Sequence, residues 1–182
     1  MSSLIRMIET ERLILRPHRL DDFDAVAAMW ADPDVVRHIG GTPFTREESW
    51  HRLARYAGLW SLLGRGLFAV IERASGRFVG EVGLARFERG LGAWFDTADE
   101  AAWVLGAAVH GRGYAAEAMR AALADHDART GGARAVCIIH PDNDASLRLA
   151  AKLGFAAFGE AAYKGAPVIL LERGAIAADA AG

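Results

Sequence analysis

The sequence predicts a mixed α/β fold, with a central, mostly antiparallel sheet and helices on both faces. Three observations lead to this prediction. Apolar runs typical of strands occur both before and after amphipathic helical segments. Two neighbouring strand-like runs are joined by a short, turn-rich link, which favours an antiparallel hairpin. Strand and helix alternate regularly only in the later part of the chain, so a strictly parallel β/α fold is excluded.

The first half of the chain supplies a strand, two helices and a hairpin. The segment ERLILRP alternates in polarity and ends at a proline, as a strand does. A helix follows over LDDFDAVAAMWADP, with an aspartate near its start and Pro33 after its end. A second helix, TREESWHRLARYAGLWSLLG, opens with a capping box at Thr45 and Glu48 and ends at Gly64. GLFAVIE and RFVGEVGLARF flank the turn residues RASG and form the hairpin.

The second half alternates strands and helices after a loop that contains GLGAW and DTADE. AAWVLGAAV is expected to be a strand, and a helix runs from Tyr114 to about Thr130, where two glycines stop it. ARAVCIIH is the next strand and DNDASLRLAAKLG the next helix. FAAFGEAAYKGAPVILLERG forms two short strands around Gly165. We expect one domain over residues 1–174 and a disordered tail over residues 175–182.

Composition narrows the class of protein. The 182 residues are 52% hydrophobic, enough for a buried core, and the net charge of −2 argues against nucleic acid as a partner. Cys137 is the only cysteine, so no internal disulfide forms. Apolar runs are far shorter than the roughly 20 residues of a membrane helix, and no secretory leader is visible, so we expect a cytoplasmic protein without a membrane partner. The histidines lack metal-binding spacing, so no metal is implied.

The segment VLGAAVHGRGYAAEAMRAAL places a glycine-hinged turn between a strand and a helix. Bare backbone N–H groups at the positive end of a helix form a site for an anion, usually a phosphate. GRGYAA formally matches the dinucleotide fingerprint, which keeps a nucleotide-dependent oxidoreductase as an alternative. However, the acidic residue that such a fold needs about 20 positions later is missing. A P-loop is excluded because no G-K-[ST] occurs.

Two motifs in the correct order fit another pattern better. His110-x-x-Gly113-x-Ala115 resembles the Q/R-x-x-G-x-G/A pyrophosphate loop of the GNAT N-acetyltransferase superfamily, with histidine in the Q/R position. HPDNDASLRLAAKLGF, further along, resembles the N-x-x-[AS]…G-F stretch of that superfamily. TERLILRP, GRGYAAEA and NDASLRLAAKLGF look like its ribosomal-protein-alanine N-acetyltransferase-like branch. The resemblance covers roughly residues 9–173.

The resemblance implies an acetyl-CoA-dependent N-acetyltransferase. A primary amine, from a protein N-terminus or a small molecule, would attack the thioester directly, and backbone amides around Ala107 to Val109 would polarise the acetyl carbonyl. Many members carry a tyrosine seven residues after the asparagine, where this chain has Ala150. A non-catalytic CoA-binding regulatory module therefore stays an alternative. The acceptor amine and the oligomeric state, a homodimer included, are left open.

The resemblance also assigns site residues. The expected contacts to acetyl-CoA are Ala107, Val109, His110, Gly111, Arg112, Gly113, Tyr114, Ala115, Asn143 and Ser146. In place of the tyrosine, Ser146 would protonate the departing thiolate. Glu100, at an acidic position of the family's fourth strand, would take the proton of the amine, with Glu81 as a second candidate. Structural readings compete with these roles: Asn143 as a helix N-cap, Glu100 as a surface acid and Arg112 as a solvated loop charge.

Overall fold

The computed structural model describes residues 7–174, which form one eight-stranded sheet with the order β1-β2-β3-β4-β5-β6-β8-β7. The strands are β1 (Ile8–Glu9), β2 (Leu13–Pro17), β3 (Leu67–Glu72), β4 (Phe78–Ala85), β5 (Asp99–Leu105), β6 (Ala135–Ile139), β7 (Ala156–Tyr163) and β8 (Ala166–Arg173). Neighbouring strands run antiparallel, except for the parallel pair β5–β6. The predicted mixed, mostly antiparallel sheet is therefore confirmed.

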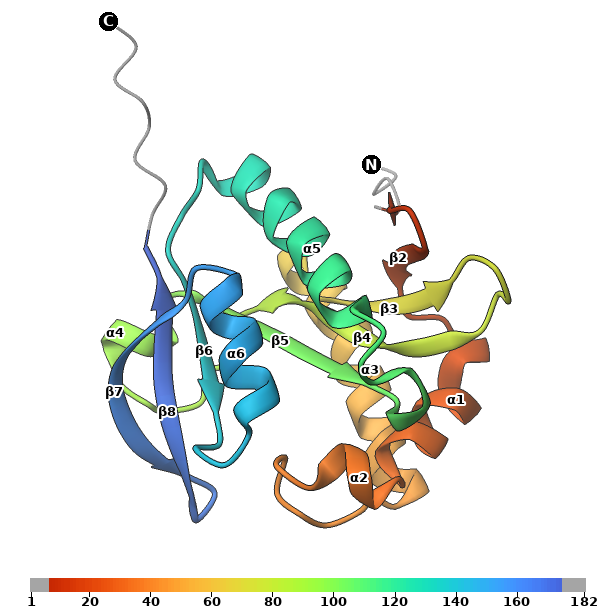
Figure 1. Ribbon diagram of the computed structural model, residues 1–182, viewed down its shortest axis with the longest axis horizontal. Coiled ribbons are helices and arrows are strands. Elements are labelled where there is room, and N and C mark those ends of the chain that lie inside the picture. The colour runs from red at the N-terminus through yellow and green to blue at the C-terminus, as the bar shows by residue number, and fades with distance from the viewer. Residues whose placement is uncertain (1–6, 175–182) are drawn as a thin grey trace, which may run out of the picture.

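Helices cover both faces of this sheet, as predicted. They are α1 (Phe23–Trp30), α2 (Pro33–Val36), α3 (Arg46–Leu63), α4 (Ala93–Asp96), α5 (Tyr114–Thr130) and α6 (Asp144–Lys152), and short 3₁₀ turns lie at η1 (Leu20–Asp22) and η2 (Ala107–Val109). Figure 1 shows α5 and α6 in front of the sheet, with α1 and α3 behind it. The main core lies under α5 and α6, where Met119 and Ala150 pack against strand residues such as Val82. A smaller core around Trp30 lies on the opposite face.

Local structure differs from the sequence prediction in three places. The strand expected to continue through Val109 stops at Leu105. The Gly106 amide donates the last hydrogen bond between β5 and β4, to Val79 O at 3.0 Å, and the chain then turns into η2. Pro33 follows the end of α1, as expected, but it also begins the short helix α2, which Asp32 caps by accepting from the Asp34 amide. The expected loop contains the single-turn α4. The predicted tail over residues 175–182 lies outside the described residues.

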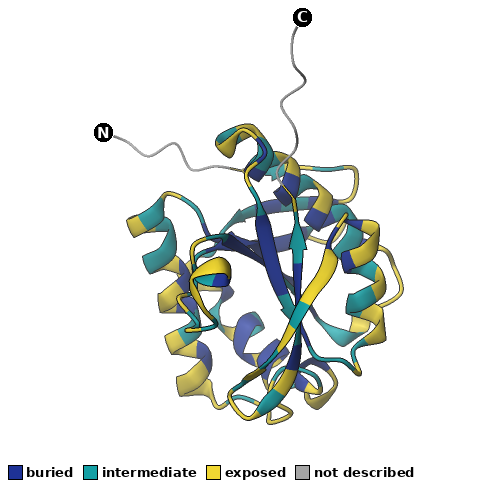
Figure 2. Ribbon diagram, turned by 90° about the vertical axis from the view of Figure 1, so that its left-hand side faces the viewer, coloured by how far each residue is buried: buried dark blue, intermediate teal, exposed yellow. Residues whose placement is uncertain are grey.

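The parallel strands β5 and β6 pair only where they begin, through Asp99 with Ala135 and Glu100 with Val136. Beyond these two pairs the strands diverge, and their carboxyl ends separate on the way to η2 and α6 (Figure 1). The far edge of the sheet is β7, whose residues are largely exposed, while buried residues concentrate in the strands behind it (Figure 2). No helix within residues 7–174 is long and apolar enough to cross a membrane.

Candidate active site

An open cleft of about 930 Å³ lies where β5 and β6 separate. Its walls come from the end of β5, η2, the start of α5, the exposed side of α6 and the loop around α2. Of the contacts to acetyl-CoA expected from the sequence, all except Arg112 line this cleft. Residues from both motifs therefore meet in one place, although a helix and a strand separate them along the chain.

The glycine-hinged loop gives this cleft a row of free backbone donors. Gly111 and Gly113 have φ angles of +75° and +77°, in the left-handed region that side chains disfavour. Gly113 is the N-cap of α5, and the first N–H that bonds within the helix is that of Glu117, to Gly113 O at 3.1 Å. The amides of Tyr114, Ala115 and the next residue precede that first bond and belong to residues that line the cleft. The helix dipole adds positive potential, so the loop suits an anion.

The side chains of His110 and Arg112 leave this loop in different directions. His110 lines the cleft, and its Nε2 donates to Leu105 O at 2.9 Å, since a carbonyl can only accept. The guanidinium of Arg112 lies 2.9 Å from Glu72 Oε1 and 4.5 Å from the centre of the Tyr114 ring. Arg112 is therefore ion-paired behind the loop, and the structure does not bring its side chain into the cleft.

Asn143 and Ser146 lie together at the start of α6. Asn143 Oδ1 accepts from the Ser146 amide at 3.1 Å, so Asn143 is the N-cap and lines the cleft at the same time. Trp103 Nε1 donates to Ser146 Oγ at 3.2 Å. Because an indole only donates, the hydroxyl proton of Ser146 stays available for another acceptor. Ala150, where the motif resemblance leads one to expect a tyrosine, is fully buried in the main core.

Glu100 is not among the residues that line the cleft. Its carboxylate forms a two-pronged ion pair with the guanidinium of Arg89, at 2.6 and 2.7 Å, and the side chain is only 4% exposed. Burial raises the pKa of Glu100, and Arg89 opposes part of that rise. The assignment of Glu100 as the base stays a prediction, and it would require this buried carboxylate to leave Arg89.

Glu81 lies nearer to the cleft. It sits in β4 directly opposite Val104 of β5, and Val104 lines the cleft. Glu81 is fully buried, and its Oε1 accepts from Trp30 Nε1 at 3.1 Å and from the Tyr56 hydroxyl at 2.5 Å. Its Oε2 accepts no hydrogen bond from the described part of the chain and lies 3.5 Å from the imidazole of His18. One carboxylate oxygen of Glu81 thus accepts no hydrogen bond from the described residues.

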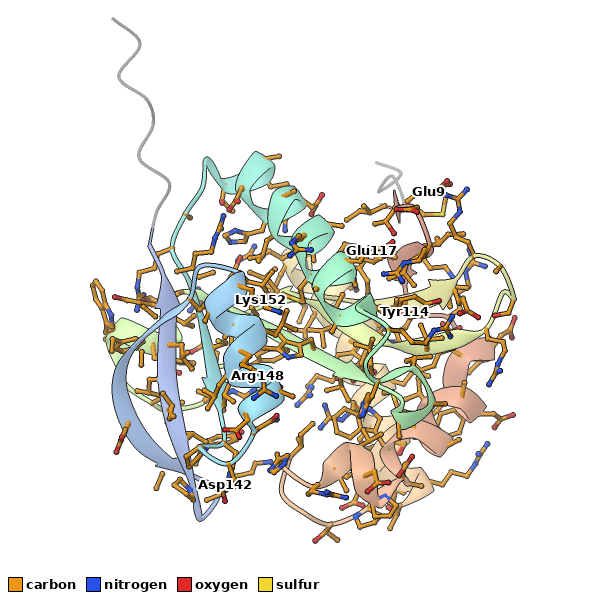
Figure 3. The ribbon with its side chains drawn as sticks, in the orientation of Figure 1. Glu9, Tyr114, Glu117, Asp142, Arg148 and Lys152 are labelled. Atoms are coloured by element: carbon orange, nitrogen blue, oxygen red, sulfur yellow. The ribbon has the colours of Figure 1, made fainter. Side chains whose placement is uncertain are left out.

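Sequence reasoning missed two groups of cleft residues. Arg148 and Lys152 lie four residues apart on α6 and add positive charge to the cleft (Figure 3). Their spacing of four residues on a predicted helix indicates that both side chains lie on one face, and this could have been recognised from the sequence. Asp34, in α2, and His38, just after that helix, also line the cleft, and only the fold brings them there. Among residues 7–174, no group of three or more His, Cys, Asp or Glu side chains could hold a metal ion.

Comparison with known proteins decides the family. Residues 12–156 match the model of an acetyltransferase (GNAT) domain. The chain is a GNAT acetyltransferase. A putative GnaT-family acetyltransferase from Bordetella pertussis is 39% identical, with a TM-score of 0.84 over 92% of this chain and 99% of that one. An uncharacterized N-acetyltransferase p20 from Bacillus licheniformis is 27% identical over 80% of each chain.

Members of the ribosomal-protein branch share the fold of this GNAT acetyltransferase. RimL, a ribosomal L7/L12 alpha-N-protein acetyltransferase solved in complex with coenzyme A, superposes with a TM-score of 0.75 over 92% of this chain and 97% of its own. Its sequence identity is 16%, so this likeness concerns the fold. Together the family match and these relatives identify an acetyl-CoA-dependent N-acetyltransferase, as the sequence motifs predict.

Proposed function

We propose that this GNAT acetyltransferase transfers the acetyl group of acetyl-CoA to a primary amine by direct attack of the amine on the thioester. The observation that carries the proposal is the row of amides at the start of α5, which opens on the same cleft as the hydroxyl of Ser146. The loop can hold a pyrophosphate, and the hydroxyl can meet a thiolate. A nucleotide-dependent oxidoreductase has no comparable support.

The cleft residues fit acetyl-CoA, which supplies an acyl group activated as a thioester. The amides of Gly113, Tyr114 and Ala115 would bind the pyrophosphate, while Asn143 would contact the pantetheine arm. Arg148 and Lys152 would add attraction for the phosphates. The cleft volume of about 930 Å³ lies in the range of pockets that take cofactors of this class. Holding both reactants in one cleft makes their encounter effectively intramolecular.

The chemical step needs a proton donor for the thiolate, a proton acceptor for the amine and polarisation of the acetyl carbonyl. The amine nitrogen bonds to the carbonyl carbon and the C–S bond breaks; Ser146 passes its hydroxyl proton to the departing thiolate and takes up a proton from water in the open cleft. The amides of Ala107 and Ala108 precede the first internal bond of η2, from Val109 N to Gly106 O, and would face the developing oxyanion. A preorganised donor of this kind contributes about 3 kcal/mol.

The amine must lose a proton, and the geometry favours Glu81 over Glu100 as its acceptor. Glu81 adjoins the cleft strand at Val104 and has one oxygen that accepts no hydrogen bond from the described residues, whereas Glu100 lies four residues earlier on β5 and is occupied by Arg89. Because Glu81 is fully buried, the proton would reach it through an ordered water.

The acceptor is a cationic amine in this proposal. Two acidic residues at the start of α6, Asp142 and Asp144, line the cleft and would attract an ammonium group, whereas Asp34 is ion-paired with Arg37. RimL is a ribosomal L7/L12 alpha-N-protein acetyltransferase, which supports an N-terminal peptide as the first acceptor to test. Homodimerisation and a cytoplasmic location stay predictions.

Thermal denaturation with ligands tests the cofactor. We expect CoA at 100 times its Kd to stabilise the protein by about 2.7 kcal/mol, and NAD or ATP to have much less effect. Equal stabilisation by NAD would contradict the proposal. Acetyl transfer is then assayed with N-terminal peptides, polyamines and aminoglycosides. Binding of CoA without transfer to any amine would favour the regulatory module.

A further inference from the structure

The loop that carries the amide row is held from behind by the segment that precedes β2. Glu117 of α5 accepts three hydrogen bonds from that segment. Its Oε1 accepts from the Arg12 amide at 2.8 Å and the Thr10 hydroxyl at 2.6 Å, and its Oε2 accepts from Arg12 Nε at 2.7 Å. Figure 3 shows Glu117 and Tyr114 near the start of α5, on the side that faces the N-terminal strands.

With Glu117 holding it, Arg12 contacts the loop itself. Its Nη1 donates to the backbone oxygen of Arg112 at 2.9 Å, and its guanidinium lies 4.7 Å from the centre of the Tyr114 ring. A Cβ on Gly113 would lie 3.5 Å from Arg12 Nη2. Arg12 therefore bonds to Arg112 and lies over the Tyr114 ring, on the rear side of the loop.

The bond to Arg112 O sets the direction of the next amide. The described chain contains no cis peptide bond, so the carbonyl of Arg112 and the N–H of Gly113 point in opposite directions. Since Arg12 holds the carbonyl at the rear, the Gly113 N–H points away from Arg12, and Gly113 lines the cleft on that side. A free loop with two glycines would sample many other orientations of this peptide.

A second contact fixes the same loop from β3. Glu72 Oε1 accepts from the Tyr114 hydroxyl at 2.5 Å and pairs with Arg112 at 2.9 Å. The loop is thus held at residues 112 and 114 by charges that lie outside the cleft. Neither Arg12 nor Glu72 is among the residues that line it.

We propose that Arg12 is a positioning residue for acetyl-CoA: held by Glu117, it fixes the Arg112–Gly113 peptide so that the Gly113 N–H faces the pyrophosphate. The inference rests on the proposed function and adds a determinant of cofactor affinity outside the cleft. The proposal gives a function to the contact between Arg12 of the TERL motif and Glu117 of GRGYAAEA.

The test compares two forms of the acyl donor. We expect Arg12→Met to raise the Kd for CoA and the KM for acetyl-CoA about tenfold, as loss of a charged hydrogen bond does, with kcat little changed. S-acetyl-pantetheine has the thioester and the arm but no pyrophosphate, so its kcat/KM should stay at the wild-type value. Arg73→Met is the matched control, because Arg73 donates to Thr10 O on the same segment and does not touch the loop.

The outcomes distinguish failure of the proposed function from failure of the positioning role of Arg12. If wild-type protein binds no CoA, the proposed function fails. If wild-type binds CoA and Arg12→Met binds it equally well, only the positioning role fails. An equal loss with S-acetyl-pantetheine would also overturn it, since a general disturbance of the fold would then explain the effect. Should Arg12→Met not fold, Glu117→Gln replaces it and must show the same selective loss for CoA, or the inference is wrong.

Discussion

Glu117 accepts hydrogen bonds from both the backbone N–H and the guanidinium of Arg12, across 105 positions of the chain. TERLILRP and GRGYAAEA, two of the motifs that carry the resemblance to the ribosomal-protein branch, therefore meet in a single contact. The contact lies behind the pyrophosphate loop and outside the cleft. In our proposal Arg12 and Glu117 hold the loop in position and take no direct part in the chemistry at the amine.

The Glu117 contact should make stability depend on acid pH. Partial burial acts to raise the pKa of Glu117, but the bonds from Thr10 and Arg12 outweigh it, so the pKa lies below its usual value. A group whose pKa is lower in the folded chain stabilises the fold above its unfolded pKa, and that contribution is lost as pH falls through the folded pKa. The Tm gap between wild type and Glu117→Gln should thus be full at pH 7 and shrink below about pH 4. Glu47→Gln, at an exposed position of α3, is the control, and a gap independent of pH would contradict the prediction.

Gly113 should be needed for its backbone conformation. Gly113 and Gly131 cap the two ends of α5, with φ of +77° and +69°, so valine at either position meets similar strain, roughly 1–2 kcal/mol. We expect both valine variants to lose comparable stability in urea denaturation. Only Gly113→Val should raise the KM for acetyl-CoA, because it alone displaces the amide row. Equal KM values for the two variants would remove Gly113 from the cofactor site.

Ser146→Ala should lower kcat by less than the roughly hundredfold at the low end of general acid catalysis, because the thiolate of CoA is already a fair leaving group. The KM for acetyl-CoA should change little, and the basic limb of the pH–rate profile should disappear. Trp103→Phe removes the donor to Ser146 Oγ and should have a smaller effect of the same kind. An unchanged kcat with an intact basic limb would leave Ser146 as a plain contact.

Glu100→Gln tests whether the buried carboxylate has a structural or a catalytic role. Removing its charge leaves Arg89 largely buried without a counterion, which should cost about 3 kcal/mol in urea denaturation. We expect the acidic limb of the pH–rate profile to stay.

Glu81→Gln is the comparison for the base. It should remove the acidic limb and lower kcat about a hundredfold. A folded Glu100→Gln enzyme that loses its acidic limb would instead support Glu100 as the base.

The sequence by itself determined the elements whose signals are local. The capping box of α3 forms as expected, with Thr45 Oγ1 accepting from the Glu48 amide and the Glu48 carboxylate accepting from the Thr45 amide. The anion loop could be predicted because the left-handed backbone conformation at Gly113, before α5, favours glycine whatever residues surround it. Such features depend on sterics and hydrogen bonds within a few residues, so their order along the chain was enough to indicate the fold.

Only the tertiary structure decided which charges meet. Glu81 lies beside the cleft because the β4–β5 register sets it opposite Val104, while Glu100 lies four residues earlier in the same ladder, where Arg89 reaches it. The direction of the Arg112 side chain follows from Glu72 at the end of β3. The periodicity of a single segment shows which face of a strand is buried, but the residue opposite it in the ladder and its ion-pair partner depend on contacts between distant segments.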